Sequence, residues 1–172
     1  MYAIGDAVLY GTNGICRIRD VTRMESCGTV DDYYELKPVS SEATTVFVPL
    51  ESEVLLSRMH PLLSPDAMRE LLDGLAASAP IWVENENQRK ILFRDIMNSG
   101  DRLAISRVYL TLRRLREERE KKGKHLRVSD ERAYRETERI FFDELSLVLG
   151  WSREECSAFL DDLPAPVEAA EV

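Results

Sequence analysis

The stretch His60-Pro61-Leu62-Leu63-Ser64-Pro65-Asp66 divides the 172-residue chain into two parts with different hydrophobic periodicities. Before it, short apolar runs alternate with polar residues, as is typical of β-strands. Ser64 and Pro65 then form a helix start, with serine at the N-cap and proline at the first helical position. After them the apolar residues recur at helical spacing. The stretch therefore predicts a β-rich first part and an all-helical second part.

The first part contains five strand-like runs separated by turn-rich pieces. The runs are residues 8–10, 15–21, 33–39, 44–48 and 53–56. Because closure of a sheet removes exposed strand edges, this many short strands favours a small antiparallel β-barrel of the Tudor-like or SH3-like type. We expect residues 1–59 to form this domain and residues 60–64 to be a linker.

The second part reads as a helical bundle, which makes the whole chain α+β. The apolar spacing predicts helices over residues 67–77, 85–98, 101–121 and 130–149, and a short helix that ends near residue 160. Ser129 is the expected N-cap of the fourth helix, and Ser152 begins a capping box. We expect residues 65–163 to form this second domain and residues 164–172 to be a flexible tail.

Charge is unevenly distributed along this acidic chain, whose formal net charge is −8. Residues 81–139 carry 16 basic and 11 acidic side chains, or +5, and acidic segments flank them. A charged, solvated helical surface explains such a segment. The other interpretation is an electrostatic footprint for phosphate groups, because local potential steers a polyanion more than net charge does.

Several classes of function find no support in the sequence. The chain lacks phosphate-binding and nucleophile-elbow motifs, and His60 and His125 have no catalytic partner at a suggestive spacing. Three widely spaced cysteines form no metal or disulfide framework. The apolar runs are too short to span a membrane. We therefore expect a cytoplasmic protein that is not an enzyme and has no catalytic residue, cofactor, metal site or membrane contact.

Trp82 lies at the start of the positive segment, in Pro80-Ile81-Trp82-Val83, just before a predicted helix. One interpretation is that Trp82 plugs the core of the bundle at the entrance to that helix. The other is an exposed aromatic wedge that stacks on or inserts between bases while nearby cations hold the DNA backbone.

Arg132, Arg135 and Arg139 share one stripe of the fourth predicted helix. A row of arginines can contact successive phosphates with forked donors. The alternative is local pairing, Arg132 with Glu136 and Arg139 with Asp143. The candidate DNA-binding residues of the positive segment are Trp82, Arg89, Lys90, Arg113, Arg114, Arg132, Arg135 and Arg139, with further lysines at 121, 122 and 124.

The run Thr45-Val46-Phe47-Val48-Pro49 is a strand that ends in proline. At the edge of the sheet it can add a strand to the sheet of another protein. The alternative is an ordinary strand with an edge proline.

The ordered set of motifs resembles the CarD/CdnL family of bacterial transcription regulators over residues 1–151. The resemblance rests on Gly5-Asp6-Ala7-Val8-Leu9-Tyr10, Tyr34-Glu35-Leu36, Val46-Phe47-Val48-Pro49, Trp82-Val83-Glu84-Asn85, Ser99-Gly100-Asp101, Ser129-Asp130-Glu131-Arg132 and the run from Asp143 to Gly150.

The resemblance implies a Tudor-like domain that binds the β-subunit lobe of bacterial RNA polymerase. The polymerase-binding residues that it implies are Arg23, Val46, Phe47, Val48 and Pro49. It also implies a helical domain at the upstream edge of the promoter bubble, where Trp82 matches a tryptophan that wedges into the minor groove. The expected outcome is stabilisation of the open promoter complex by a monomer, without recognition of a specific operator.

A second hypothesis is a protein–protein adaptor. In that case the barrel binds a partner by strand addition, and the helices provide a further docking surface that does not contact DNA. The two hypotheses differ in the salt dependence of any effect on a polymerase–promoter complex.

Overall fold

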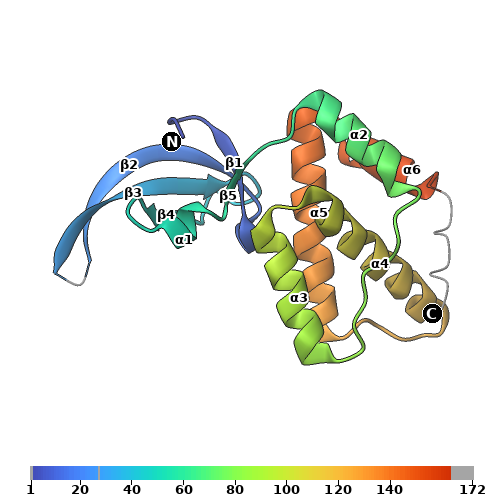
Figure 1. Cartoon of the computed structure of the whole chain (residues 1–172). Coiled ribbons are helices and arrows are strands. Elements are labelled where there is room, and N and C mark those ends of the chain that lie inside the picture. Colours follow the sequence, from blue (N-terminus) through green and yellow to red (C-terminus); the bar gives the residue numbers. More distant parts are fainter. Residues whose placement is uncertain (1, 27, 164–172) are drawn as a thin grey trace.

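The computed structural model describes residues 2–26 and 28–163, and Figure 1 shows a curved β-sheet beside a group of helices. One antiparallel sheet has the strand order β4-β3-β2-β1-β5. Its strands are β1 (Ala7–Tyr10), β2 (Ile15–Ser26), β3 (Thr29–Pro38), β4 (Val46–Pro49) and β5 (Met59–Pro61). The expected fold class, a Tudor-like antiparallel β domain followed by helices, is confirmed. The tail expected at residues 164–172 lies outside the described residues.

The strand expected at residues 53–56 is wrong, because Glu53–Leu56 forms a short helix, α1. The Ser52 hydroxyl caps it by accepting the Leu55 N–H at 3.4 Å, and Leu55 and Leu56 pack against the core of the β domain. A four-residue apolar run has no period that separates helix from strand. The fifth strand is instead β5, which overlaps the end of the expected β domain and the first two residues of the expected linker.

Strand β1 is buried on both faces because its side chains alternate in direction. Val8 and Tyr10 join the core of the β domain, together with residues such as Ile18, Leu36 and Val48. Leu9 belongs to a different hydrophobic cluster. This cluster also contains Ile15, which lies opposite Leu9 in the β1–β2 pair, and three residues of the helices, Met97, Ile105 and Ile140. The β domain therefore contributes residues of β1 and of the start of β2 to a hydrophobic junction with the helical part.

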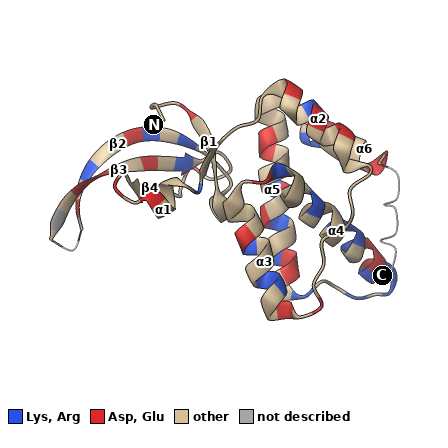
Figure 2. Ribbon diagram, viewed as in Figure 1, with Lys and Arg blue, Asp and Glu red and all other residues tan. Residues whose placement is uncertain are grey.

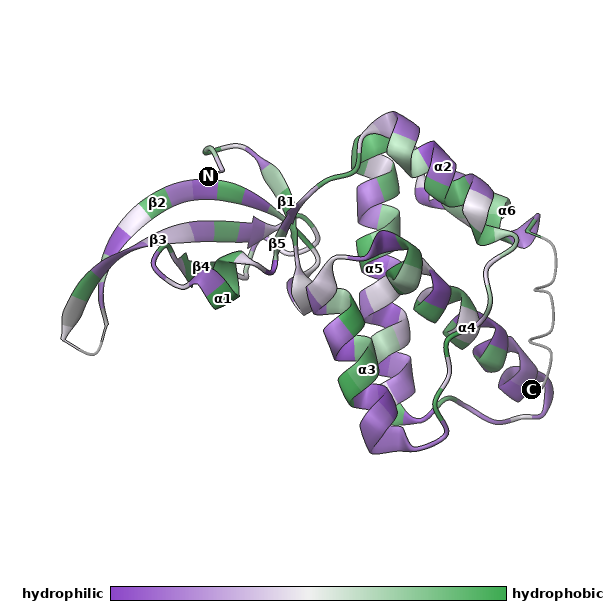
Figure 3. Cartoon of the chain, in the orientation of Figure 1, coloured by the Kyte–Doolittle hydropathy of each residue, from purple (hydrophilic) through white to green (hydrophobic). Residues whose placement is uncertain are grey.

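The helical part agrees closely with the sequence pattern. Its helices are α2 (Pro65–Leu75), α3 (Glu86–Ser99), α4 (Arg102–Lys121), α5 (Val128–Leu149) and α6 (Arg153–Asp161). Ser64, Asn85, Asp101 and Ser152 cap four of them with side-chain hydrogen bonds. Both hydrophobic and hydrophilic residues occur along each helix (Figure 3), as expected for helices with one buried face.

The N-cap expected at Ser129 is wrong. Helix α5 begins two residues earlier than expected, at Val128 after Arg127, and the Ser129 hydroxyl donates to the Glu86 carboxylate at 2.9 Å instead. Further along, Tyr134, Phe141 and Phe142 pack around Tyr109 of α4, with ring centroids 5.4 to 6.1 Å from that ring. These aromatic contacts hold α4 and α5 together at the centre of the helical part.

A buried ion pair between α4 and α5 lies beside the segment that joins the two parts. Arg102 Nε lies 3.1 Å from Glu144 Oε2, and both side chains are less than a tenth exposed. Arg102 also donates to the Pro61 carbonyl at 2.6 Å, and Glu144 accepts the Leu63 N–H at 3.0 Å. The segment expected as a linker, residues 60–64, is thus held by β5 pairing at one end and by this ion pair at the other.

Two further contacts close the junction. The His60 ring lies within hydrogen-bond distance of the Asn98 carbonyl, 3.1 Å from Nε2. Gly100 has a φ of +70°, and a Cβ built at this position would lie 2.3 Å from the His60 ring. Glycine is required here for both the left-handed conformation and the close approach.

Replacing Glu144 with alanine should destabilise the protein strongly, because Arg102 would remain buried without its counter-charge. We expect a loss of about 3–5 kcal/mol in the free energy of unfolding. Urea denaturation measures this loss. The matched control is Asp66→Ala, which removes the exposed Arg69–Asp66 pair and should cost about 0–1 kcal/mol. Equal effects of the two substitutions would contradict a structural role for the buried pair.

Candidate nucleic-acid interface

Trp82 is half-buried, which is intermediate between the core plug and the exposed wedge that the sequence left open. It lies in the segment between α2 and α3, and part of its ring packs against the helical core. Ile81 anchors the segment by donating its N–H to Thr111 Oγ1 of α4 at 3.0 Å. The Trp82 indole N–H donates to Glu84 Oε1 at 2.9 Å. The ring is therefore anchored to the core and still reaches the surface.

Arg89 is a buried residue, so the structure contradicts its expected role as a surface DNA contact. Its side chain is 2% exposed, and its Nε and Nη2 each donate to a carboxylate oxygen of Asp130 at 2.9 Å. The Arg89 guanidinium carbon lies 4.0 Å from the centroid of the Trp82 ring. Burial of this cation could not be read from the sequence, because Asp130 is 41 residues away.

The expected arginine stripe on α5 divides into two environments. Arg132 pairs with Glu136 at 2.9 Å, and Arg135 pairs with Glu131 at 3.0 Å; both arginine side chains are about three-quarters exposed. Arg139 is turned toward the β domain, where its Nη2 donates to the Thr12 carbonyl at 2.8 Å. Arg139 is thus a contact of the junction, and the pairing expected with Asp143 is replaced by this hydrogen bond.

The remaining candidates differ in their availability. Lys90 is half exposed and pairs with Glu86 at 2.9 Å. Arg113 is mostly buried and pairs with Glu117 and with Asp161 of α6. Arg114 is half-buried and makes no ion pair within the described part of the chain.

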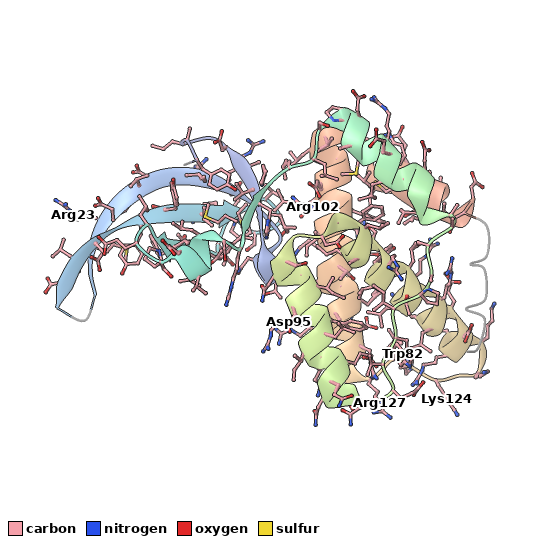
Figure 4. All side chains as sticks on the ribbon, viewed as in Figure 1. Arg23, Trp82, Asp95, Arg102, Lys124 and Arg127 are labelled. Carbon is pink, nitrogen blue, oxygen red and sulfur yellow. The ribbon has the colours of Figure 1, made fainter. Side chains whose placement is uncertain are left out.

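Three lysines at the end of α4 and in the loop after it have no carboxylate partner among the described residues. Lys121, Lys122 and Lys124 are exposed, and within residues 2–26 and 28–163 none of them makes an ion pair. Figure 2 shows Lys and Arg along this loop, and Figure 4 places Lys124 and Arg127 at the same end of the helical part as Trp82. The sequence counted these lysines only as part of the positive segment and did not single out Arg127.

Glu86 joins the beginnings of α3 and α5 beside this loop. It accepts contacts from Lys90 at 2.9 Å, from the Ser129 hydroxyl at 2.9 Å and from Arg127 Nη1 at 2.8 Å. These hydrogen bonds to the charged form lower the pKa of the Glu86 carboxyl from 4.5 to about 2. At neutral pH the carboxylate therefore neutralises part of the local positive charge.

The strand expected to bind a partner lies at one end of the sheet order. β4 pairs with β3, and its Phe47 side chain is 42% exposed while Val48 is fully buried. Phe47 is opposite Glu35, and Val48 is opposite Tyr34, so these two β4 side chains point to opposite faces. Arg23, on the β2–β3 hairpin, pairs with Asp32 at 3.3 Å.

No helix in the described part of the chain is both long and apolar enough to cross a membrane. The same residues contain no group of three or more His, Cys, Asp or Glu side chains placed to hold a metal ion.

Comparison with known families matches the two parts of the fold separately. The model of the CarD-like/TRCF RID domain matches residues 2–60. The model of the CarD C-terminal domain matches residues 70–161, which is more than half of the chain. The chain belongs to the CarD family. A comparison with curated proteins finds no match.

Membership of the CarD family settles the general function. RID stands for RNA-polymerase-interacting domain, and the protein is a CarD-like transcription regulator that interacts with RNA polymerase. The family is one of non-enzymatic transcription factors.

Acidification should remove the contribution of Glu86 to stability. Its pKa is lower in the folded state than in the unfolded state, so the contribution is fully present above about pH 4.5 and disappears as the pH falls toward about 2. The Glu86→Gln variant should therefore be less stable than the wild type at pH 7, and the two should converge near pH 2. Chemical denaturation across this range measures the difference. A stability difference that does not change with pH would contradict the assignment.

Proposed function

We propose that this CarD-family protein binds the β-subunit lobe through the edge of its β domain and stabilises the open promoter complex through Trp82. The observation that carries the proposal is the anchored, half-exposed indole at the end of the helical part that also bears the unpaired lysines. An aromatic ring can stack on an unpaired base or enter a widened base step, and adjacent lysines can neutralise the flanking phosphates.

The polymerase contact is assigned to β4. An edge strand offers unpaired backbone groups to a strand of the partner, and the exposed Phe47 adds apolar area on one face. Val46, Val48 and Pro49 contribute through their backbone and their packing. Arg23 is a more distant contact on the hairpin, because its register partner is Asp32 and not a residue of β4.

The DNA contact is assigned to Trp82 with Lys90, Arg114, Arg132 and Arg135, and to the loop lysines. Exposed ion pairs such as Arg132–Glu136 are weak because water screens them, so a phosphate can replace the glutamate. Arg89, Arg113 and Arg139 are withdrawn as direct phosphate contacts because their side chains are buried or paired within the fold.

Weak binding to free DNA follows from this distribution of charge. Most cations of residues 81–139 have a carboxylate neighbour, which leaves few charges to release counterions from DNA. Attachment to polymerase raises the effective concentration of the helical part at the promoter. A cytoplasmic monomer is sufficient for this two-point attachment.

Trp82→Ala should shorten the lifetime of the open complex, because the stacking surface is lost while the cations remain. Stacking of one base is worth about 1–3 kcal/mol, so a reduction of about tenfold is expected. The measurement is dissociation of a fluorescent polymerase–promoter complex after addition of a competitor. The matched control is Trp151→Phe, because Trp151 packs on Phe159 of α6. An unchanged lifetime in Trp82→Ala would reject the wedge.

Lys124→Gln should reduce the salt dependence of this stabilisation. Loss of one phosphate contact lowers the slope of log affinity against log salt by about 0.9. The measurement is the concentration of protein needed for half-maximal stabilisation at several salt concentrations. Arg69→Gln, on α2 and outside the positive segment, is the control. A stabilisation that is independent of salt in the wild type would favour the adaptor hypothesis.

A further inference from the structure

Arg89 combines deep burial with four hydrogen bonds. Its Nε and Nη2 hold the two oxygens of Asp130, and its Nη1 donates to the carbonyls of Val83 at 2.6 Å and Glu84 at 3.1 Å. Burial of a guanidinium is costly unless its donors are satisfied in this way. The two carbonyls belong to the residues that directly follow Trp82, so Arg89 fixes the backbone beside that residue.

The face of the same guanidinium covers one face of the indole. Because the donors are used within the plane, the flat face of the group is free to stack, and it lies 4.0 Å from the Trp82 ring centroid. Arginine suits this arrangement because its fork is planar and always charged. Trp82 is thus held through its backbone, through one ring face and through the indole N–H that Glu84 accepts.

Asp130 connects this arrangement to the body of the helical part. It lies in the first turn of α5, where a carboxylate is favoured by the helix dipole, and it is buried. Arg89 is on α3, whose beginning is tied to α5 by Glu86 through Ser129 and Arg127. The orientation of the ring is therefore set by two helices and not only by the segment between α2 and α3.

A structural role would not require these charges. Replacing a buried ion pair with apolar residues of similar volume is often neutral or stabilising. The charged pair adds what an apolar pair lacks, a flat cation against the ring and two donors for the neighbouring carbonyls. Both features act on Trp82.

We infer that Arg89, oriented by Asp130, is a positioning residue that holds the Trp82 indole in its DNA-binding orientation before DNA arrives. This inference rests on the proposed role of Trp82 at the promoter. One ring face remains covered, so the opposite face and the outer edge are presented to the bases. The entropy cost of immobilising the Trp82 side chain is met during folding, so it does not reduce the free energy of DNA binding.

The test uses a Trp151→Phe background, in which Trp82 is the single tryptophan. The double variant Arg89→Met/Asp130→Leu removes both charges and keeps side chains of similar size. We expect its unfolding midpoint to remain close to that of the background and its Trp82 fluorescence to be quenched more readily by acrylamide. The open-complex lifetime should shorten by about two- to tenfold, because the ring must now be ordered on binding.

Two further variants keep the outcome decisive. Arg89→Lys retains a charge opposite Asp130 but loses the fork, so it should shift quenching and lifetime in the same direction even if the double variant fails to fold. Arg69→Lys, which alters an exposed arginine of α2, should change neither.

The outcomes separate this inference from the proposal that it rests on. Unchanged quenching in both Arg89 variants would overturn the inference. So would an unchanged open-complex lifetime in these variants when Trp82→Ala shortens it. If Trp82→Ala itself leaves the lifetime unchanged, the wedge proposal is overturned and the inference falls with it.

Discussion

The buried ion pair between Arg102 and Glu144 is the constraint on which the arrangement of the molecule depends. It lies where the chain passes from sheet to helices, and both partners also hold the backbone of residues 61 and 63. A buried pair of this kind is costly to break because the remaining charge cannot be solvated. Around it, Leu9 and Ile15 of the sheet meet Met97, Ile105 and Ile140 of the helices, so that apolar packing and charge pairing act at the same place.

A second buried pair, Arg89–Asp130, organises the opposite end of the helical part. In both pairs one carboxylate accepts from the arginine, and other donors of the guanidinium reach backbone carbonyls. Arg89 uses Nε and Nη2 for the carboxylate, whereas Arg102 uses only Nε. They differ in what they hold. Arg102 fixes the passage between the two parts of the fold, and Arg89 contacts the one aromatic ring to which we assign a role at DNA. In both cases a buried carboxylate within the protein neutralises the positive charge of the arginine.

Local sequence signals predicted most of the fold. The helices begin and end within two residues of their expected bounds. Their starts are predictable because N-caps such as Ser64, Asp101 and Ser152 bond to a backbone N–H only three residues along the chain. The run 53–56 was assigned wrongly because it is too short to show a period. Ser129 was assigned wrongly as a cap because its hydroxyl has a partner 43 residues away.

The site was less predictable because its chemistry depends on contacts between distant residues. Trp82 stood out by its position, but the buried state of Arg89 and the turn of Arg139 toward Thr12, 127 residues away, leave no local trace. The local sequence around a buried arginine is similar to that around an exposed one, so it does not reveal which arginines are buried. The distinction appears only once the helices are packed.

The two-sided burial of β1 has a consequence for how the protein spans its two contacts. Since Val8 faces the core of the β domain and Leu9 faces the helices, the sheet edge at β4 and the indole of Trp82 belong to one solid body and are not joined by a tether (Figure 1). The distance between the β4 edge and Trp82 is therefore set by packing. With polymerase and DNA bound at these two places, as we propose, we expect the protein to distinguish promoter complexes by their geometry and not by their base sequence.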